Sequence, residues 1–99
     1  MYTKKVITKW QRDSYPDCGT ADRDGDQSAA LAELDAKTTA MVAEGKMREN
    51  PVVAGSGTTI STIRYVTDQP AADEWISFID EFATKYGFVK ISSTVKSVE

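Results

Sequence analysis

The N-terminal residues alternate between apolar and polar side chains, which is the period of a strand with one face toward a core. Within residues 3–12, Val6 and Trp10 share one phase of this alternation and Ile7 lies in the other. The segment is rich in β-branched and aromatic residues, which favour extended structure. We therefore predict a strand, followed by an acidic loop over residues 13–27, where five aspartates accompany no periodic apolar residue.

The segment after this loop has the periodicity of a helix. Ser28 can serve as its N-cap, and Gly45 as its C-terminal stop after about Glu44. The apolar positions recur at intervals of three and four residues. They are Leu31, Leu34, Thr38, Met41 and Val42.

A glycine-rich turn separates two further extended segments. Residues 52–54 form a short apolar run, and residues 58–67 are rich in β-branched and hydroxyl-bearing side chains. Gly55, Ser56 and Gly57 supply the positive φ angles that a tight reversal needs. The simplest interpretation is a hairpin with its turn at these three residues.

The second predicted helix has the clearest boundaries in the chain. Asp68 stands before Pro70 as an N-cap stands before a first-turn proline, and Gly87 is the C-terminal stop. One face of the helix is apolar, and its residues are Trp75, Ile79, Phe82, Ala83 and Tyr86. Residues 88–98 then alternate again and predict a last strand.

The resulting order, β-α-β-β-α-β, predicts one α+β domain over residues 1–99 with a ferredoxin-like fold. In this fold two helices cover one face of a four-stranded antiparallel sheet. Yet apolar residues occupy both phases of the first strand, with Val6 and Ile7, and of the third, with Ile60 and Ile63. We therefore expect a homodimer that packs through the second face of the sheet.

Composition and charge exclude several classes of function. The 99 residues include 12 Lys and Arg against 15 Asp and Glu, a net charge of −3, without a long basic run. This balance disfavours nucleic acid as a partner. The sequence contains no secretory signal and no apolar run that could span a bilayer, so we expect a cytoplasmic protein without membrane contact.

The reactive side chains are few. The chain has no histidine, which excludes Ser-His and Cys-His dyads and His-ligated metals, and it has one cysteine, Cys18, without an intrachain partner. Carboxylates, lysines, tyrosines and this thiol remain for proton transfer. No cofactor is expected, and the sequence favours a protein that is not an enzyme without deciding the question.

Two groups of residues are candidate sites. The residues Asp22, Asp24, Asp26, Ser28 and Glu33 have the spacing of a calcium loop. Gln27 replaces the glycine that such a loop needs at its turn, so a solvated acidic loop is the preferred interpretation and no metal is expected. The candidates for ligand binding are Trp10, Arg64, Tyr65 and Trp75.

The stretch Thr59–Ile79, which runs TISTIRYVTDQPAADEWISFI, resembles a strand-to-helix passage of the antibiotic-biosynthesis-monooxygenase-like group of dimeric α+β barrels. The resemblance implies a ferredoxin-like subunit that dimerises through its sheet, in some members with a small aromatic or haem-like ligand between sheet and helices. Members that degrade haem bind iron through a histidine, which is absent here. The resemblance therefore carries over the architecture and no catalytic residue.

Two functional hypotheses follow. The first is a small non-enzymatic homodimeric protein with an interaction or structural role and an unknown protein partner, as in an accessory protein of a phage or bacterium. The second is a cofactor-independent monooxygenase-like enzyme or small-ligand binder of the barrel group. A closed apolar pocket lined by Trp10 or Tyr65 would favour the second hypothesis, and a filled core would count against it.

Overall fold

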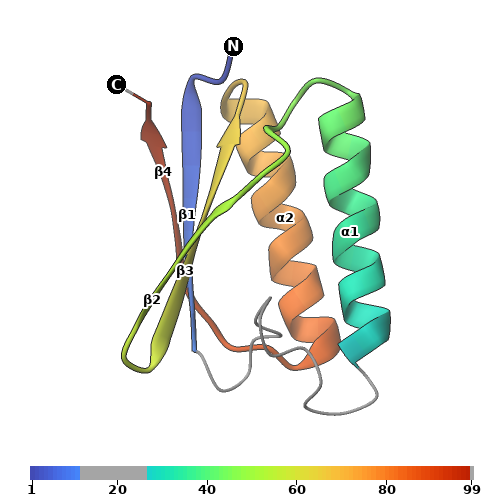
Figure 1. Ribbon diagram of the computed structural model, residues 1–99, viewed down its shortest axis with the longest axis vertical. Coiled ribbons are helices and arrows are strands. Elements are labelled where there is room, and N and C mark those ends of the chain that lie inside the picture. The colour runs from blue at the N-terminus through green and yellow to red at the C-terminus, as the bar shows by residue number, and fades with distance from the viewer. Residues whose placement is uncertain (12–26, 99) are drawn as a thin grey trace.

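The computed structural model describes residues 1–11 and 27–98, which form an open four-stranded sheet covered on one face by two helices (Figure 1). The elements are β1 (Lys4–Gln11), α1 (Gln27–Ala43), β2 (Val52–Ser56), β3 (Thr59–Val66), α2 (Gln69–Tyr86) and β4 (Lys90–Ser97). Across the sheet the strands lie in the order β2-β3-β1-β4, and all neighbours are antiparallel. The predicted α+β class with an antiparallel sheet and two helices is confirmed.

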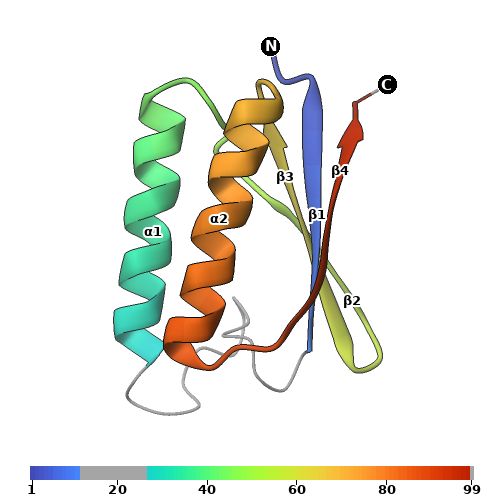
Figure 2. The same cartoon turned by 180° about the vertical axis from the view of Figure 1, so that it is seen from behind.

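The two central strands show which apolar phase meets the helices. Val6 and Trp10 of β1 are fully buried beneath the helices, as is Ile60 of β3, which pairs with Trp10. Ile7 and Ile63 pair with each other in the opposite phase and are only half-buried. The view from behind shows both helices on the same side of the sheet (Figure 2). The face opposite the helices is called the open face below.

Helix α2 has the boundaries that the sequence predicts. The Asp68 carboxylate accepts a hydrogen bond from the Ala71 amide at 3.0 Å, which satisfies one of the free N–H groups of the first turn. Gly87 has a φ of 76°, and its N–H donates to the carbonyl of Ala83. Trp75, Ile79 and Phe82 are buried against the sheet, so the predicted apolar face is the packed one.

Helix α1 differs from its prediction in two respects. It begins at Gln27, so Ser28 lies inside the first turn and the prediction of Ser28 as N-cap is wrong. Among its predicted apolar positions Met41 is buried, whereas Leu31, Leu34 and Thr38 are only half-buried. The strands pack closely against α2, and α1 stands farther from them.

The β2–β3 hairpin turns later than predicted. Both Gly55 and Ser56 belong to β2 and pair with β3, so the turn consists of Gly57 and Thr58. Gly57 has a φ of 61°, the sign that the first position of a two-residue type II′ turn requires. The prediction placed the turn at residues 55–57, because glycine composition does not show which glycine adopts the positive angle.

The connection from α1 to β2 is tied to the end of β3. Met47 is fully buried and forms an isolated bridge with Val66, and the Arg48 amide donates to the Tyr65 carbonyl at 2.9 Å. This pairing holds the connection beside the sheet. Neither of the two helices in the described residues is long and apolar enough to cross a membrane.

Candidate functional site

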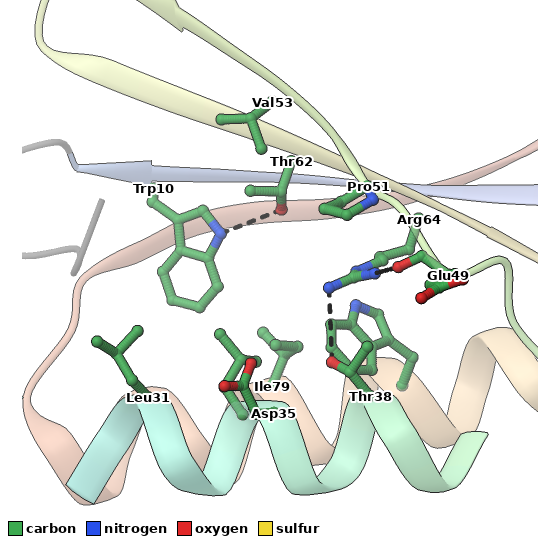
Figure 3. Close-up of a pocket in the computed structure, with 12 residues that line it drawn as sticks. Trp10, Leu31, Asp35, Thr38, Glu49, Pro51, Val53, Thr62, Arg64 and Ile79 are labelled. Atoms are coloured by element: carbon green, nitrogen blue, oxygen red, sulfur yellow. Dashed lines mark hydrogen bonds between the residues drawn. The ribbon is translucent and has the colours of Figure 1, made fainter. Parts of the chain in front are cut away.

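A pocket of about 280 Å³ lies between the helix-facing side of the sheet and helix α1 (Figure 3). Helix α2 packs closely against β1, β3 and β4, whereas α1 stands farther from the strands, which leaves space between α1 and the sheet. Every element except β4 contributes lining residues, and so does the connection from α1 to β2.

Most of the lining is apolar. Trp10 and Leu31 lie at one end of the pocket in Figure 3, and Val53 of β2 lies on the wall opposite α1. Leu34, Ile79 and Pro51 complete the apolar surface. Such a surface favours a ligand with an apolar body, because binding removes apolar area from water on both sides.

The other end of the pocket is built around Arg64. This residue belongs to the buried phase of β3 and is only 9% exposed. Its guanidinium donates hydrogen bonds to the Glu49 carbonyl at 3.3 Å and to the Thr38 hydroxyl at 3.5 Å. It also lies 5.2 Å from the centre of the Trp75 ring, within the range of a cation–π contact.

These contacts hold a cation at the edge of the core. Arginine keeps its charge at all physiological pH values, so the guanidinium must be solvated by protein groups where water is excluded. Its planar shape allows it to face an aromatic ring while its edge donates hydrogen bonds. The pocket therefore has a fixed positive charge at one end and an apolar surface at the other.

Trp10 closes the apolar end. It is 1% exposed, and its indole N–H donates to the Thr62 hydroxyl at 3.4 Å across the pocket wall. The edge of its ring also meets Phe88, with 6.5 Å between ring centres. Packing and this hydrogen bond fix the orientation of the ring, which gives the pocket a rigid wall at this end.

The structure brings together three of the four residues predicted to bind a ligand. Trp10, Arg64 and Trp75 all line the pocket. Tyr65 does not, because it lies in the opposite phase of β3, where the Arg48 guanidinium stacks on its ring at 4.2 Å.

Sequence reasoning did not identify the other lining residues. Thr38, Leu34 and Asp35 follow from the position of α1 relative to the sheet, which no local pattern determines. The signal for a polar end of the pocket is Arg64, which the sequence did identify and which alternates with Ile60 and Val66 in a buried phase. A charged residue in such a phase marks a place where the core contains polar groups.

Most of the calcium-loop candidates lie outside the part of the chain that the structure describes. These are Asp22, Asp24, Asp26 and the side chain of Ser28, while Glu33 accepts hydrogen bonds from Lys85 and Tyr86. Within residues 1–11 and 27–98, no group of three or more His, Cys, Asp or Glu side chains could hold a metal ion.

Two clusters of ionisable side chains lie outside the pocket lining and join the two helices. Glu33 of α1 accepts hydrogen bonds from Lys85 and from the Tyr86 hydroxyl, both at 2.8 Å. These bonds lower the pKa of Glu33, mainly through Lys85, and the bond to Glu33 raises the pKa of Tyr86. At neutral pH the carboxylate therefore stays ionised and the phenol stays protonated, which suits a structural role better than proton transfer.

The second cluster is centred on Glu74 of α2. Lys37 of α1 approaches it at 2.7 Å and Lys46 of the following connection at 3.0 Å. The hydrogen bond from Lys37, followed by that from Lys46, lowers the pKa of Glu74, and Glu74 in turn raises the pKa of Lys46. This cluster fixes the end of α1 against α2.

The chain matches no known protein family, and neither the curated proteins nor the solved structures contain a match to it.

Proposed function

We propose that this protein binds a small, flat, mainly apolar ligand in the pocket between α1 and the sheet. The observation that carries the proposal is the hollow of about 280 Å³ beside Trp10 and Arg64, where a small domain would otherwise be filled. A dry cavity of about 150 Å³ is enough for benzene. The pocket therefore suits a single substituted ring.

The chemistry of the lining favours binding over catalysis. Arg64 can orient a ligand but does not exchange protons at neutral pH. The side chains of Asp35 and Glu49 belong to exposed residues at the rim, where water competes for any proton transfer. We therefore favour a binding protein over an enzyme.

We also propose that the chain has a ferredoxin-like fold. The order of elements along the chain and the order β2-β3-β1-β4 across the sheet support it. The resemblance of residues 59–79 to the dimeric α+β barrels supports both the fold and the place of the ligand, since in some members of that group a ligand lies between sheet and helices. We infer that this chain uses the same space.

A matched pair of threonine variants tests the proposal. Thr38 faces the pocket, whereas its neighbour Thr39 is exposed on the same helix. The probes are benzoate, benzamide and benzylamine, and the readout is the set of amide shifts in ¹⁵N-labelled protein. We expect benzoate and benzamide to shift amides around Trp10 and Arg64, and benzylamine to bind weakest beside the guanidinium.

Thr38→Leu should narrow the pocket beside Arg64 and weaken these shifts, and Thr39→Leu should leave them unchanged. The spectrum of each variant also reports whether the fold is intact. If none of the probes shifts the pocket amides, or if Thr38→Leu binds them as the wild type does, the proposed function is wrong.

A further inference from the structure

The open face of the sheet carries one apolar row between two rows that contain lysine. The pairing of the strands defines these rows across the sheet. The apolar row consists of Val52, Ile63 and Ile7, and it ends at Thr94 of β4. Val52 is 39% exposed, and the two isoleucines are half-buried, so this surface is available for contact.

The flanking rows are cationic. On one side, Tyr65 is followed by Lys5 and Lys96, which pair directly across β1 and β4. On the other side, Lys9 lies between Ser61 and Ser92. These neighbours are hydroxyl-bearing or neutral, so the rows gather positive charge that no side chain within them balances.

The strands contain no carboxylate that could compensate these lysines. Every charged residue in β1, β2, β3 and β4 is Lys or Arg. The ion pairs among the described residues involve other lysines, namely Lys37, Lys46, Lys85 and Lys90, and each of these meets a carboxylate of a helix or of its flanking turn. Arg48 adds a further cation beside Tyr65.

We propose that the open face binds an acidic, amphipathic segment of another protein. Apolar side chains of the partner pack on the row of Val52, Ile63 and Ile7, and its carboxylates meet Lys5, Lys9 and Lys96. Charge complementarity selects this partner, since opposite charges around an apolar strip give both attraction and register.

Two other occupants fit the face less well. A second copy related by a two-fold axis would bring its own lysine rows against these, and like charges at an interface are unfavourable. Single-stranded nucleic acid needs exposed aromatic rings for its bases. The face offers only Tyr65 among the described strands, and Arg48 covers one side of that ring.

Fluorescence anisotropy with labelled probes tests the proposal. The first probe is a peptide in which glutamate alternates with leucine, the second replaces glutamate by lysine, and the third is an oligothymidine. We expect only the first peptide to bind, and its affinity to fall as salt is added. Replacing Lys5, Lys9 and Lys96 by glutamine should weaken binding about tenfold.

Two control variants separate this surface from general effects. Lys85→Gln removes the same kind of charge from helix α2, on the other side of the molecule, and should leave binding unchanged. Ile63→Thr keeps a β-branched residue on β3 but makes the row polar, and should weaken binding. Equal loss in Lys85→Gln, preference for oligothymidine, or no binding of the glutamate peptide would overturn the proposal. None of these results bears on the proposed binding of a ligand in the pocket, which lies on the opposite side of the sheet.

Discussion

Arg64 combines three contacts that a different cation cannot make together. It donates to the Glu49 carbonyl and to Thr38 while it faces the ring of Trp75. A lysine has a compact ammonium group without the planar fork, so it can replace the charge but not this geometry.

We predict that Arg64→Lys lowers the free energy of unfolding by about 1–2 kcal/mol, the cost of losing hydrogen bonds to a buried charged group. Urea unfolding at neutral pH measures this loss. Arg48→Lys is the matched control, because Arg48 is exposed on the open face. Its effect should stay within about 0.5 kcal/mol. Equal losses in both variants would show that Arg64 has no special role in the core.

At the scale of single elements, the sequence predicted what local chemistry determines. Asp68, Pro70 and Gly87 determine the ends of α2 through backbone hydrogen bonds and dihedral preferences within a few residues. The ends of α2 could therefore be predicted, as could the existence of every strand and helix.

The remaining features depend on packing between elements. Val6 and Ile7 are both apolar, so the sequence alone does not show which face of β1 the helices cover. In the structure they cover the face of Val6. The pocket depends on how closely α1 approaches the sheet, and among the large apolar side chains of α1 only Met41 is fully buried. The sequence could therefore name Trp10 and Arg64 but could not place Thr38 beside them.

The two helices are joined by ion pairs that should make the stability of the protein depend on pH. The pKa of Glu74 is lowered in the folded protein by Lys37 and Lys46, and that of Glu33 by Lys85 and Tyr86. The unfolded chain, with ordinary pKa values near 4.5, then binds more protons than the folded one in the acid range. The stabilisation is therefore complete above about pH 4.5 and is lost as the pH falls through the lowered values.

We predict that Glu74→Gln is less stable than the wild type at neutral pH, and that the difference shrinks as the pH falls below 4.5. Urea unfolding at a series of pH values gives both curves. Glu81→Gln is the control, since Glu81 forms no ion pair with any described residue. A difference for Glu74→Gln that stays constant with pH would show that the carboxylate charge does not contribute.

Over the whole molecule, the net charge of −3 is distributed unevenly between the sheet and the layer of helices. The strands carry only cationic side chains, whereas carboxylates predominate among the charged residues of the helices. The sequence shows no long basic run because the lysines of the open face come from β1 and β4, which adjoin only in the folded protein. For an acidic partner, added salt should therefore weaken its attraction to the open face and reduce its repulsion from the helix layer.

The homodimer expected from the sequence can be tested through this charge separation. If two copies pack through their open faces, Lys5, Lys9 and Lys96 of each copy approach those of the other, and the repulsion extends over a Debye length of about 30 Å at 0.01 M salt but only about 3 Å at 1 M. We therefore predict a mass near 10.9 kDa by light scattering at low salt, with dimers forming only as salt is added. Binding of an acidic partner should weaken over the same salt range. Screening removes the attraction in the complex with that partner, whereas between two copies it removes the repulsion. A dimer that is stable at low salt and unchanged by Lys9→Gln would show that the copies associate through another surface.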